Sequence, residues 1–201
     1  MRKTKEEADV TRQTLLDAAL QVFSSKGYAA ARLEDIADAA HVTRGAIYHH
    51  FGSKAELFKT LVLDASQRSD QAIAQAIQEG GSFMDIGRRI LVYTLRMLEE
   101  NTSYRETLAL YLFRSSDVEE LAEFHNFAVR SSEEAIEQTR DYFKVAIEQG
   151  EVRSDLDADI AARAFLAYQT GLTMLYLTVP NSIRPEQAAP LAEIFISGFK
   201  G

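Results

Sequence analysis

Four side chains suited to binding nucleic acid lie within seven residues, between Arg44 and His50. Arginine is the side chain that most often reads guanine through two hydrogen bonds, and Tyr48, His49 and His50 can donate to phosphate oxygens. Lys54 follows at the expected start of the next helix, where an ammonium group and free backbone N–H groups suit a phosphate. These residue types at this spacing predict a surface that contacts DNA.

Other chemistry has less support. The adjacent histidines suggest a metal site, but their side chains diverge on a helix and no cysteine or carboxylate completes a ligand set. The chain has no cysteine, which excludes disulfides and cysteine nucleophiles. It has no Gly-rich phosphate loop and no Gly-x-Ser-x-Gly motif, and His125 has no evident triad partner. We therefore expect no catalytic residue, metal or cofactor. An enzyme and a helical interaction module without a DNA role are the alternative hypotheses.

The candidate DNA-contacting residues lie on the second of two short helices, expected over 33–40 and 44–50. Three residues connect these helices, and the last of them, Thr43, is a natural N-cap. This is helix-turn-helix spacing, in which the second helix enters the major groove. Ile47 is expected to point inward, and Gly45 to let the backbone approach DNA closely. The spacing alone leaves open a helical protein that does not bind DNA.

Charge is unevenly distributed along the 201 residues, whose formal net charge is −8. Residues 1–60 carry nine Lys or Arg against eight Asp or Glu, whereas residues 61–201 carry thirteen against twenty-two. A nearly neutral head therefore precedes an acidic body, which directs attention to the head as the DNA-binding part. No signal-type apolar region and no credible membrane span is present, so we expect a cytoplasmic protein with no membrane partner.

Helical periodicity runs through the whole chain, and all three prolines lie after residue 179. Four Ser/Thr-x-x-Glu capping boxes begin at Thr4, Ser53, Ser103 and Ser116. We predict an all-α fold, with a helix-turn-helix domain over 1–52 and a helical effector-binding and dimerisation domain over 53–201. The nine expected helices cover roughly 5–26, 33–40, 44–50, 54–79, 83–101, 104–115, 118–149, 157–179 and 185–199.

The head resembles the DNA-binding domain of TetR-family transcriptional regulators, and within that family it is most similar to the repressors of multidrug efflux pumps. The resemblance covers about 60 of the 201 residues. It is carried by Gly27-Tyr28, Ile36-Ala37, the run Val42-Thr43-Arg44-Gly45-Ala46-Ile47-Tyr48, His50-Phe51, Lys54 and Leu57.

The resemblance implies a role for each matching position. Thr43, Arg44 and Gly45 would lie at base edges or adjoining phosphates, and Tyr48 and His50 would bind phosphate. At two further positions, His49 would vary with operator specificity and Lys54 would anchor its helix to the DNA backbone. It also implies that the long helix after residue 53 couples the two domains.

Two positions depart from the family pattern. The family usually has Ser or Thr before the second helix, where this chain has Arg32, whose charge can still reach a phosphate. The turn glycine of the family is His41 here. A turn residue often needs a positive φ, which histidine tolerates better than most residues, so we expect some strain and no loss of the fold.

A homodimer is expected through the last two long helices. The segment 157–179 is apolar nearly all round, and a helix without a polar face is buried on more than one side. The expected dimer contacts are Ala164, Tyr168, Gly171, Leu175, Phe195 and Phe199. The alternative is the central helix of a monomer core, which conflicts with the recognition of a palindrome by two heads.

An effector pocket is expected where polar residues interrupt apolar helices, because a buried polar group needs a partner. Such a pocket suits a small apolar or aromatic effector, which would release operator DNA. For each residue, ordinary core packing is the alternative. The expected lining is Leu91, Thr94, Thr107, Tyr111, Leu166, Gln169, Thr170 and Met174.

Overall fold

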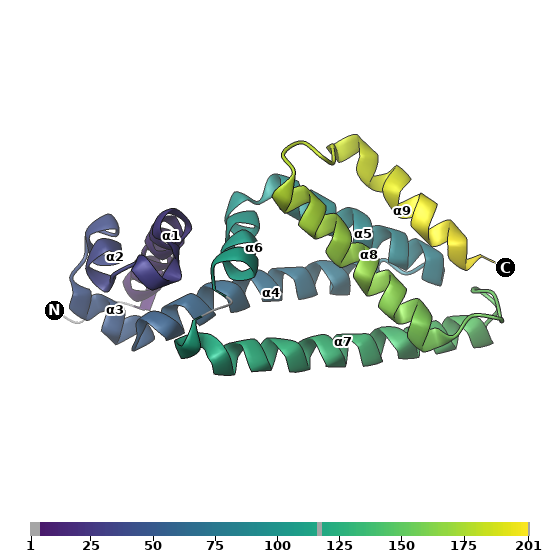
Figure 1. Ribbon diagram of the computed structural model, residues 1–201, viewed down its shortest axis with the longest axis horizontal. Coiled ribbons are helices and arrows are strands. Elements are labelled where there is room, and N and C mark those ends of the chain that lie inside the picture. Colours follow the sequence, from purple (N-terminus) through teal and green to yellow (C-terminus); the bar gives the residue numbers. More distant parts are fainter. Residues whose placement is uncertain (1–4, 116–117, 201) are drawn as a thin grey trace. The chain divides into compact units, whose positions relative to one another are not determined.

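The structure is a computed structural model that describes residues 5–115 and 118–200, and every regular element in these ranges is helical (Figure 1). The α-helices are α1 (Lys5–Ala30), α2 (Leu33–Ala39), α3 (Arg44–Phe51), α4 (Lys54–Gln78), α5 (Phe83–Glu100), α6 (Thr102–Arg114), α7 (Ala122–Glu148), α8 (Ala158–Thr178) and α9 (Ala188–Ile196). Three single-turn 3-10 helices are η1 (Glu119–Leu121), η2 (Pro185–Gln187) and η3 (Ser197–Phe199). The expected all-α fold is confirmed.

Local backbone features agree with the sequence interpretation of the head. The backbone of α1 leaves helical geometry at Gly27, whose φ is 76°, where the sequence predicts the end of this helix. His41 has a φ of 53°, as expected for a residue that takes the place of a turn glycine. A left-handed backbone costs a non-glycine residue some free energy, yet the turn between α2 and α3 keeps its tight form.

Side-chain caps fix several helix starts. The hydroxyl of Ser53 accepts a hydrogen bond from the backbone of Glu56 at 3.1 Å, as the capping box predicts. Ser82 and Asp85 form a reciprocal capping box at the start of α5, which a search for glutamate at the fourth position misses. The expected boxes at Thr4 and Ser116 lie outside the described residues.

The described residues divide into two compact units. The first contains the residues up to 67 together with 103–125, and the second contains 68–102 together with 126–200. Helix α4 contributes its first half to one unit and its second half to the other. The expected domain boundary after residue 52 therefore differs from this division, and it stays a prediction.

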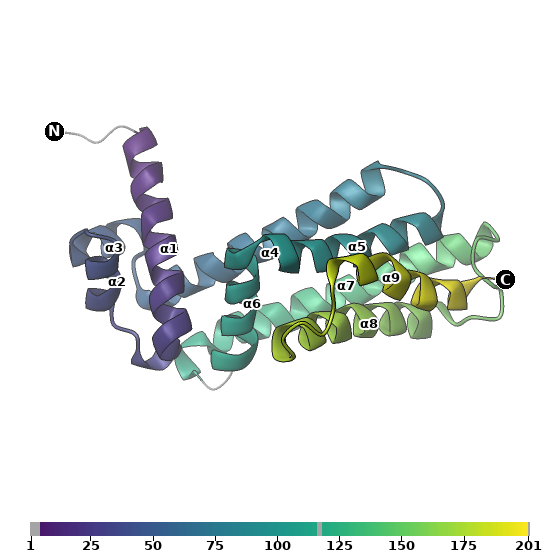
Figure 2. The ribbon, with the colours of Figure 1, turned by 90° about the horizontal axis from the view of Figure 1, so that it is seen from above.

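The first unit has an aromatic core that holds the short helices in place. Helix α1 packs on α2, and α2 packs on α3 (Figure 2). The rings of Phe23, Tyr28 and Phe58 lie with their centroids 5.1–5.7 Å apart, and Ile36 and Ile47 are fully buried. Helices as short as α2 and α3 are unstable alone, so this burial stabilises them. The expected inward position of Ile47 is confirmed.

The second unit is organised around Phe143 of α7, which is 1% exposed. Its ring lies 4.7 Å from Phe83 and 5.1 Å from Phe199, measured between centroids. Helix α5 packs on both α8 and α9. A Cβ at Gly87 of α5 would lie 3.0 Å from the Cδ1 atom of Ile196, so the glycine permits the close approach of α5 and α9. Within the described residues, no helix is long and apolar enough to cross a membrane.

Candidate nucleic-acid interface and effector cavity

Arg44 lies at the first position of α3, and its guanidinium is held by two neighbours. It donates to the Glu34 carboxylate of α2 at 2.6 Å and to the Tyr48 hydroxyl at 2.8 Å, and it lies 5.3 Å from the centre of the Tyr48 ring. The hydrogen bond with Tyr48, followed by the charge of Glu34, raises the pKa of Arg44 above its ordinary value. The guanidinium of Arg44 is therefore a cation that is already oriented on an exposed surface.

The neighbouring candidates on α3 are also accessible. Thr43 is the N-cap and makes no side-chain hydrogen bond to the helix. The side chains of Thr43, Tyr48 and His49 are exposed and that of His50 is half-buried. A Cβ at Gly45 would meet the Thr43 hydroxyl at 3.7 Å, which is ordinary contact, so the fold itself does not require glycine there. The structure thus places these predicted residues along the two turns of α3 and its N-cap, with all but His50 exposed.

Arg32 precedes α2 and is exposed, but it does not cap the helix through its side chain. Instead the Asp35 carboxylate accepts from the backbone N–H of Arg32 at 3.1 Å, and it pairs with Lys26 at 2.9 Å. The guanidinium of Arg32 is therefore not used to start the helix. Its expected contact with a phosphate stays a prediction.

Lys54 has a structural role that the sequence did not reveal. Its ammonium group donates to the carbonyl oxygens of Tyr28 at 3.0 Å and Ala31 at 3.2 Å, and it lies 4.3 Å from the centre of the Tyr28 ring. An ammonium group has three donors, so one remains for another acceptor. The expected phosphate contact stays a prediction, and the structure adds that Lys54 ties the start of α4 to the end of α1.

Replacement of Lys54 by methionine is expected to lower the free energy of unfolding by about 1–3 kcal/mol, because two carbonyl groups lose a charged donor while the aliphatic stem is kept. Urea denaturation followed by circular dichroism measures this change. Lys59→Met on the same helix is the control, since Lys59 only pairs with Glu56 one turn away and should contribute at most about 0.5 kcal/mol. Equal losses in the two variants would contradict the structural role of Lys54.

The segment 103–125 is anchored to the head within the first unit. The hydroxyl of Tyr28 donates to the Glu120 carboxylate of η1 at 2.6 Å, and Arg114 of α6 donates to the carbonyl of Ser24. Burial, followed by the hydrogen bond and the charge of Glu120, raises the pKa of Tyr28 above its ordinary value. The hydroxyl therefore remains a donor at physiological pH.

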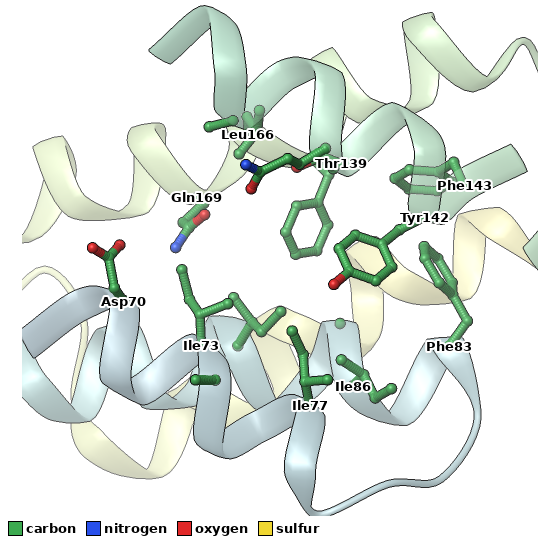
Figure 3. A pocket seen from close by; sticks show the side chains of 16 residues that line it. Asp70, Ile73, Ile77, Phe83, Ile86, Thr139, Tyr142, Phe143, Leu166 and Gln169 are labelled. Atoms are coloured by element: carbon green, nitrogen blue, oxygen red, sulfur yellow. The ribbon is translucent and has the colours of Figure 1, made fainter. Parts of the chain in front are cut away.

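A cavity of about 400 Å³ lies in the second unit (Figure 3). Its lining comes from α4, α5, α7 and α8, and on the first three of these helices it repeats at i, i+3, i+4 and i+7. The lining residues are Asp70, Ile73, Ala74, Ile77, Phe83, Ile86, Gly87, Ile90, Ala135, Gln138, Thr139, Tyr142, Phe143, Phe165, Leu166 and Gln169. This volume and mostly apolar lining suit a small organic ligand.

Two of the eight residues expected to bind an effector, Leu166 and Gln169, line this cavity. Thr94 is not part of the lining, but its hydroxyl accepts a hydrogen bond from the Gln169 amide at 2.9 Å. Leu91 is fully buried in the core and is not part of the lining. Thr170 is exposed and Met174 is half-buried, and neither lines the cavity.

Thr107 and Tyr111 belong to the first unit and do not line this cavity. Thr107 is 3% exposed, and the Tyr111 ring packs against Phe124 at 5.9 Å and His125 at 5.8 Å. The expectation that they share a pocket with Gln169 has no support from the cavity. Their helix turns this face toward the core that surrounds α1 and η1.

Most of the residues that line the cavity were not predicted from the sequence, although polar residues on apolar stripes of α4 and α7 could have indicated them. On α4, Asp70 precedes Ile73, Ala74 and Ile77 at helical spacing, so an acidic residue stands on an apolar stripe. On α7, the corresponding stripe holds Gln138, Thr139 and Tyr142.

The residues expected at a dimer interface fall into two groups. Ala164, Gly171 and Leu175 are exposed on α8 in the single chain. Tyr168 and Phe195 are half-buried and stack on each other with centroids 4.1 Å apart.

Phe199 differs from these residues because it is 6% exposed and packs on Phe143. It is a core residue of the second unit, so a direct contact from Phe199 to a partner has no support from the single chain. The sequence alone could not show that Phe195 is half-buried whereas Phe199 is a core residue, because both lie on one apolar stripe.

Residues 15–61 match the family model described as "Bacterial regulatory proteins, tetR family". The chain is 32% identical over 188 residues to the HTH-type transcriptional regulator TtgR of Pseudomonas putida, covering 91% of this chain and 88% of TtgR. Among solved structures, it is similar to NalD, the secondary repressor of the MexAB-OprM multidrug efflux pump in Pseudomonas aeruginosa. That match has a TM-score of 0.83 and 27% identity, and covers 98% of both chains. SmeT in complex with triclosan has the same fold, with a TM-score of 0.78, 24% identity and coverage of 96% and 92%.

Proposed function

Because the chain belongs to the TetR family of bacterial regulatory proteins, we propose that it is a homodimeric repressor that binds a palindromic operator and is released by a small apolar or aromatic effector. The chain is a transcriptional regulator and not an enzyme. A repressor of this kind acts in the cytoplasm, where bacterial DNA lies. We further propose that it controls an efflux pump, as the name of its structural neighbour NalD states for that protein.

DNA binding is supported by the exposed first turn of α3. Arg44 is already oriented there by Glu34 and Tyr48, Thr43 is accessible beside it, and His49 is accessible on the next turn of the helix. In helix-turn-helix proteins, the start of the second helix contacts base edges. This pre-oriented arginine on the recognition helix is the observation that carries the proposal.

Dimerisation is supported by apolar side chains that the single chain leaves exposed on α8, at its C-cap Val179 and on α9. Leu175 is 44% exposed, Val179 is 47% exposed and Ile194 is 74% exposed. Two copies related by a two-fold axis would cover these side chains and present two heads to a palindrome. Contact through Ala164, Tyr168, Gly171, Leu175 and Phe195 remains part of this proposal.

Regulation by an effector is supported by the cavity and by the continuity of α4. One end of α4 carries Lys54, which is tied to the head, and the other carries Asp70 and Ile77, which line the cavity. A ligand changes DNA affinity only if it binds the DNA-incompetent conformation better. Because α4 begins in the head and its second half lines the cavity, a ligand that binds there can favour one position of α4 and so one conformation of the head.

The proposal is tested by operator selection followed by a linkage titration. Selection from random duplex DNA should enrich a palindrome with half-sites separated by about one helical turn or a multiple of it. An aromatic probe, 1-naphthalenemethanol, is then titrated into the protein with and without that operator. Operator DNA should weaken probe binding by the same factor as the probe weakens operator binding, typically about 5- to 150-fold.

Two results would count against this function. Enrichment of no sequence would reject operator recognition. Probe affinity that is identical with and without operator would reject release by an apolar or aromatic effector, while DNA binding would stand.

A further inference from the structure

Asp70 is the one lining residue of the cavity whose side chain belongs to the classes that are charged at neutral pH, Asp, Glu, Lys and Arg. The other fifteen lining residues are apolar or neutral, and none is Lys, Arg or His. Asp70 faces the same side of α4 as Ile73 and Ile77, because residues three and seven positions apart share a helix face. Figure 3 shows the Asp70 and Gln169 side chains at one end of the cavity and Phe83 at the other.

The carboxylate of Asp70 has no cationic partner among the described residues. Other acidic side chains of the second unit do have one: Asp85 pairs with Arg88 at 2.8 Å, and Asp159 pairs with Arg163 at 2.7 Å. Asp70 makes no such ion pair and no hydrogen bond with a described residue. Its charge is therefore balanced by solvent alone and is available to a ligand.

The orientation of Gln169 adds a second acceptor at the same end. The hydroxyl of Thr94 donates its hydrogen to the carbonyl of Ile90 at 2.9 Å, so it can only accept from Gln169. The nitrogen of the Gln169 amide must therefore face Thr94, and its carbonyl oxygen is left as an acceptor. This oxygen accepts no hydrogen bond from a described residue.

We propose that the cavity selects an organic cation, with an ammonium group at Asp70 and Gln169 and an aromatic or apolar body along Ile73, Ile77 and Phe83. A carboxylate and a carbonyl oxygen both require a donor, and the carboxylate repels an anion. The net charge of −9 on residues 61–201 also raises the local concentration of cations. This inference rests on the proposed function only for the assignment of the cavity as the effector site.

Three probes with the same aromatic body and different charge test the selection: 1-naphthylmethylamine, 1-naphthalenemethanol and 1-naphthoate at pH 7. Their affinities for the full-length protein are measured by calorimetry. The amine should bind about three- to fivefold more tightly than the alcohol, because Asp70 is exposed to solvent and water weakens its attraction for the ammonium group. The carboxylate should bind more weakly than both.

Asp70→Asn should reduce amine affinity to within about twofold of alcohol affinity, with alcohol binding unchanged, because only the Coulombic attraction is removed. Asp64→Asn is the matched control. It makes the same chemical change on the same helix at a position outside the lining, and should leave the amine-to-alcohol ratio as in the wild type. Circular dichroism and operator binding establish that each variant is folded.

Equal binding of the amine and the alcohol, or an unchanged ratio in Asp70→Asn, would overturn charge selection and leave release by a neutral aromatic effector intact. Tightest binding by naphthoate would also overturn it. Binding of none of the probes by a protein that still binds operator would reject the cavity as the effector site. A wild-type protein that binds the selected operator no more tightly than unrelated DNA would instead refute the proposed function.

Discussion

Replacement of Arg44 by alanine is expected to remove most of the preference for operator over unrelated DNA. The guanidinium lies on the first turn of α3, held by Glu34 at 2.6 Å and Tyr48 at 2.8 Å. A lost bidentate contact with guanine should weaken operator binding by about tenfold or more per half-site, and a dimer has two half-sites. Fluorescence anisotropy with the selected operator and a shuffled duplex, both at one salt concentration, measures the ratio.

Glu34→Gln provides the matched comparison for this prediction. It keeps the shape of the partner, releases Arg44 from its ion pair and removes a negative charge close to the recognition helix. Affinity for unrelated DNA should rise by about two- to fivefold, because repulsion between Glu34 and phosphates is removed. Arg44→Ala with the operator preference of the wild type would reject the assignment of Arg44 as a base-reading residue.

Replacement of Gly171 by arginine is expected to convert the protein to monomers and to weaken palindrome binding. Gly171 is exposed on α8, and a Cβ built there meets no atom within 4 Å in the single chain. The fold of one subunit therefore tolerates a side chain at this position. A two-fold contact through α8 would instead bury an unpaired charge, which is costly. Sedimentation velocity at micromolar concentration measures the change in mass.

Gly171→Ala is the control for this variant. It shows whether dimerisation is lost because of the bulk and charge of the arginine side chain or because the glycine backbone is replaced. Alanine adds only a methyl group in open space and favours the helix by up to about 1 kcal/mol, so this variant should remain dimeric. Circular dichroism should show that both variants are helical. A dimeric Gly171→Arg variant, or a wild type that is monomeric yet binds the palindrome tightly, would contradict the proposed interface.

Features that depend on neighbours in the sequence were predictable. The helix boundaries agree with the structure to within a few residues, because caps, glycines and prolines act within one or two turns. The positive φ of His41 and the burial of Ile47 also follow from local geometry, since three residues that connect two helices leave few conformations. The exposed position of Arg44 is a consequence of the same spacing.

Tertiary packing decided what amphipathic patterns leave open. A helix of period 3.6 shows which face is apolar, but not whether that face meets another helix or a void. The stripe of Asp70, Ile73 and Ile77 could therefore not be recognised as the wall of a cavity, whereas Leu91 lies in the solid core. Thr107 is likewise buried in the first unit, which combines two separate stretches of the chain.

Lys54 illustrates how the two levels combine in one residue. Its place at the start of α4, and the resemblance of the head to TetR-family regulators, are visible in the sequence and predict a phosphate contact. Only the fold brings the carbonyl groups of Tyr28 and Ala31 within 3.2 Å of its ammonium group. The sequence by itself thus determined the helices, the turn and the chemistry that the head displays. The tertiary structure decided which polar groups form hydrogen bonds within the protein and which, like Asp70, remain available to a ligand. The physical reason is that both hydrogen bonds and cavities are formed by residues that are far apart in the chain.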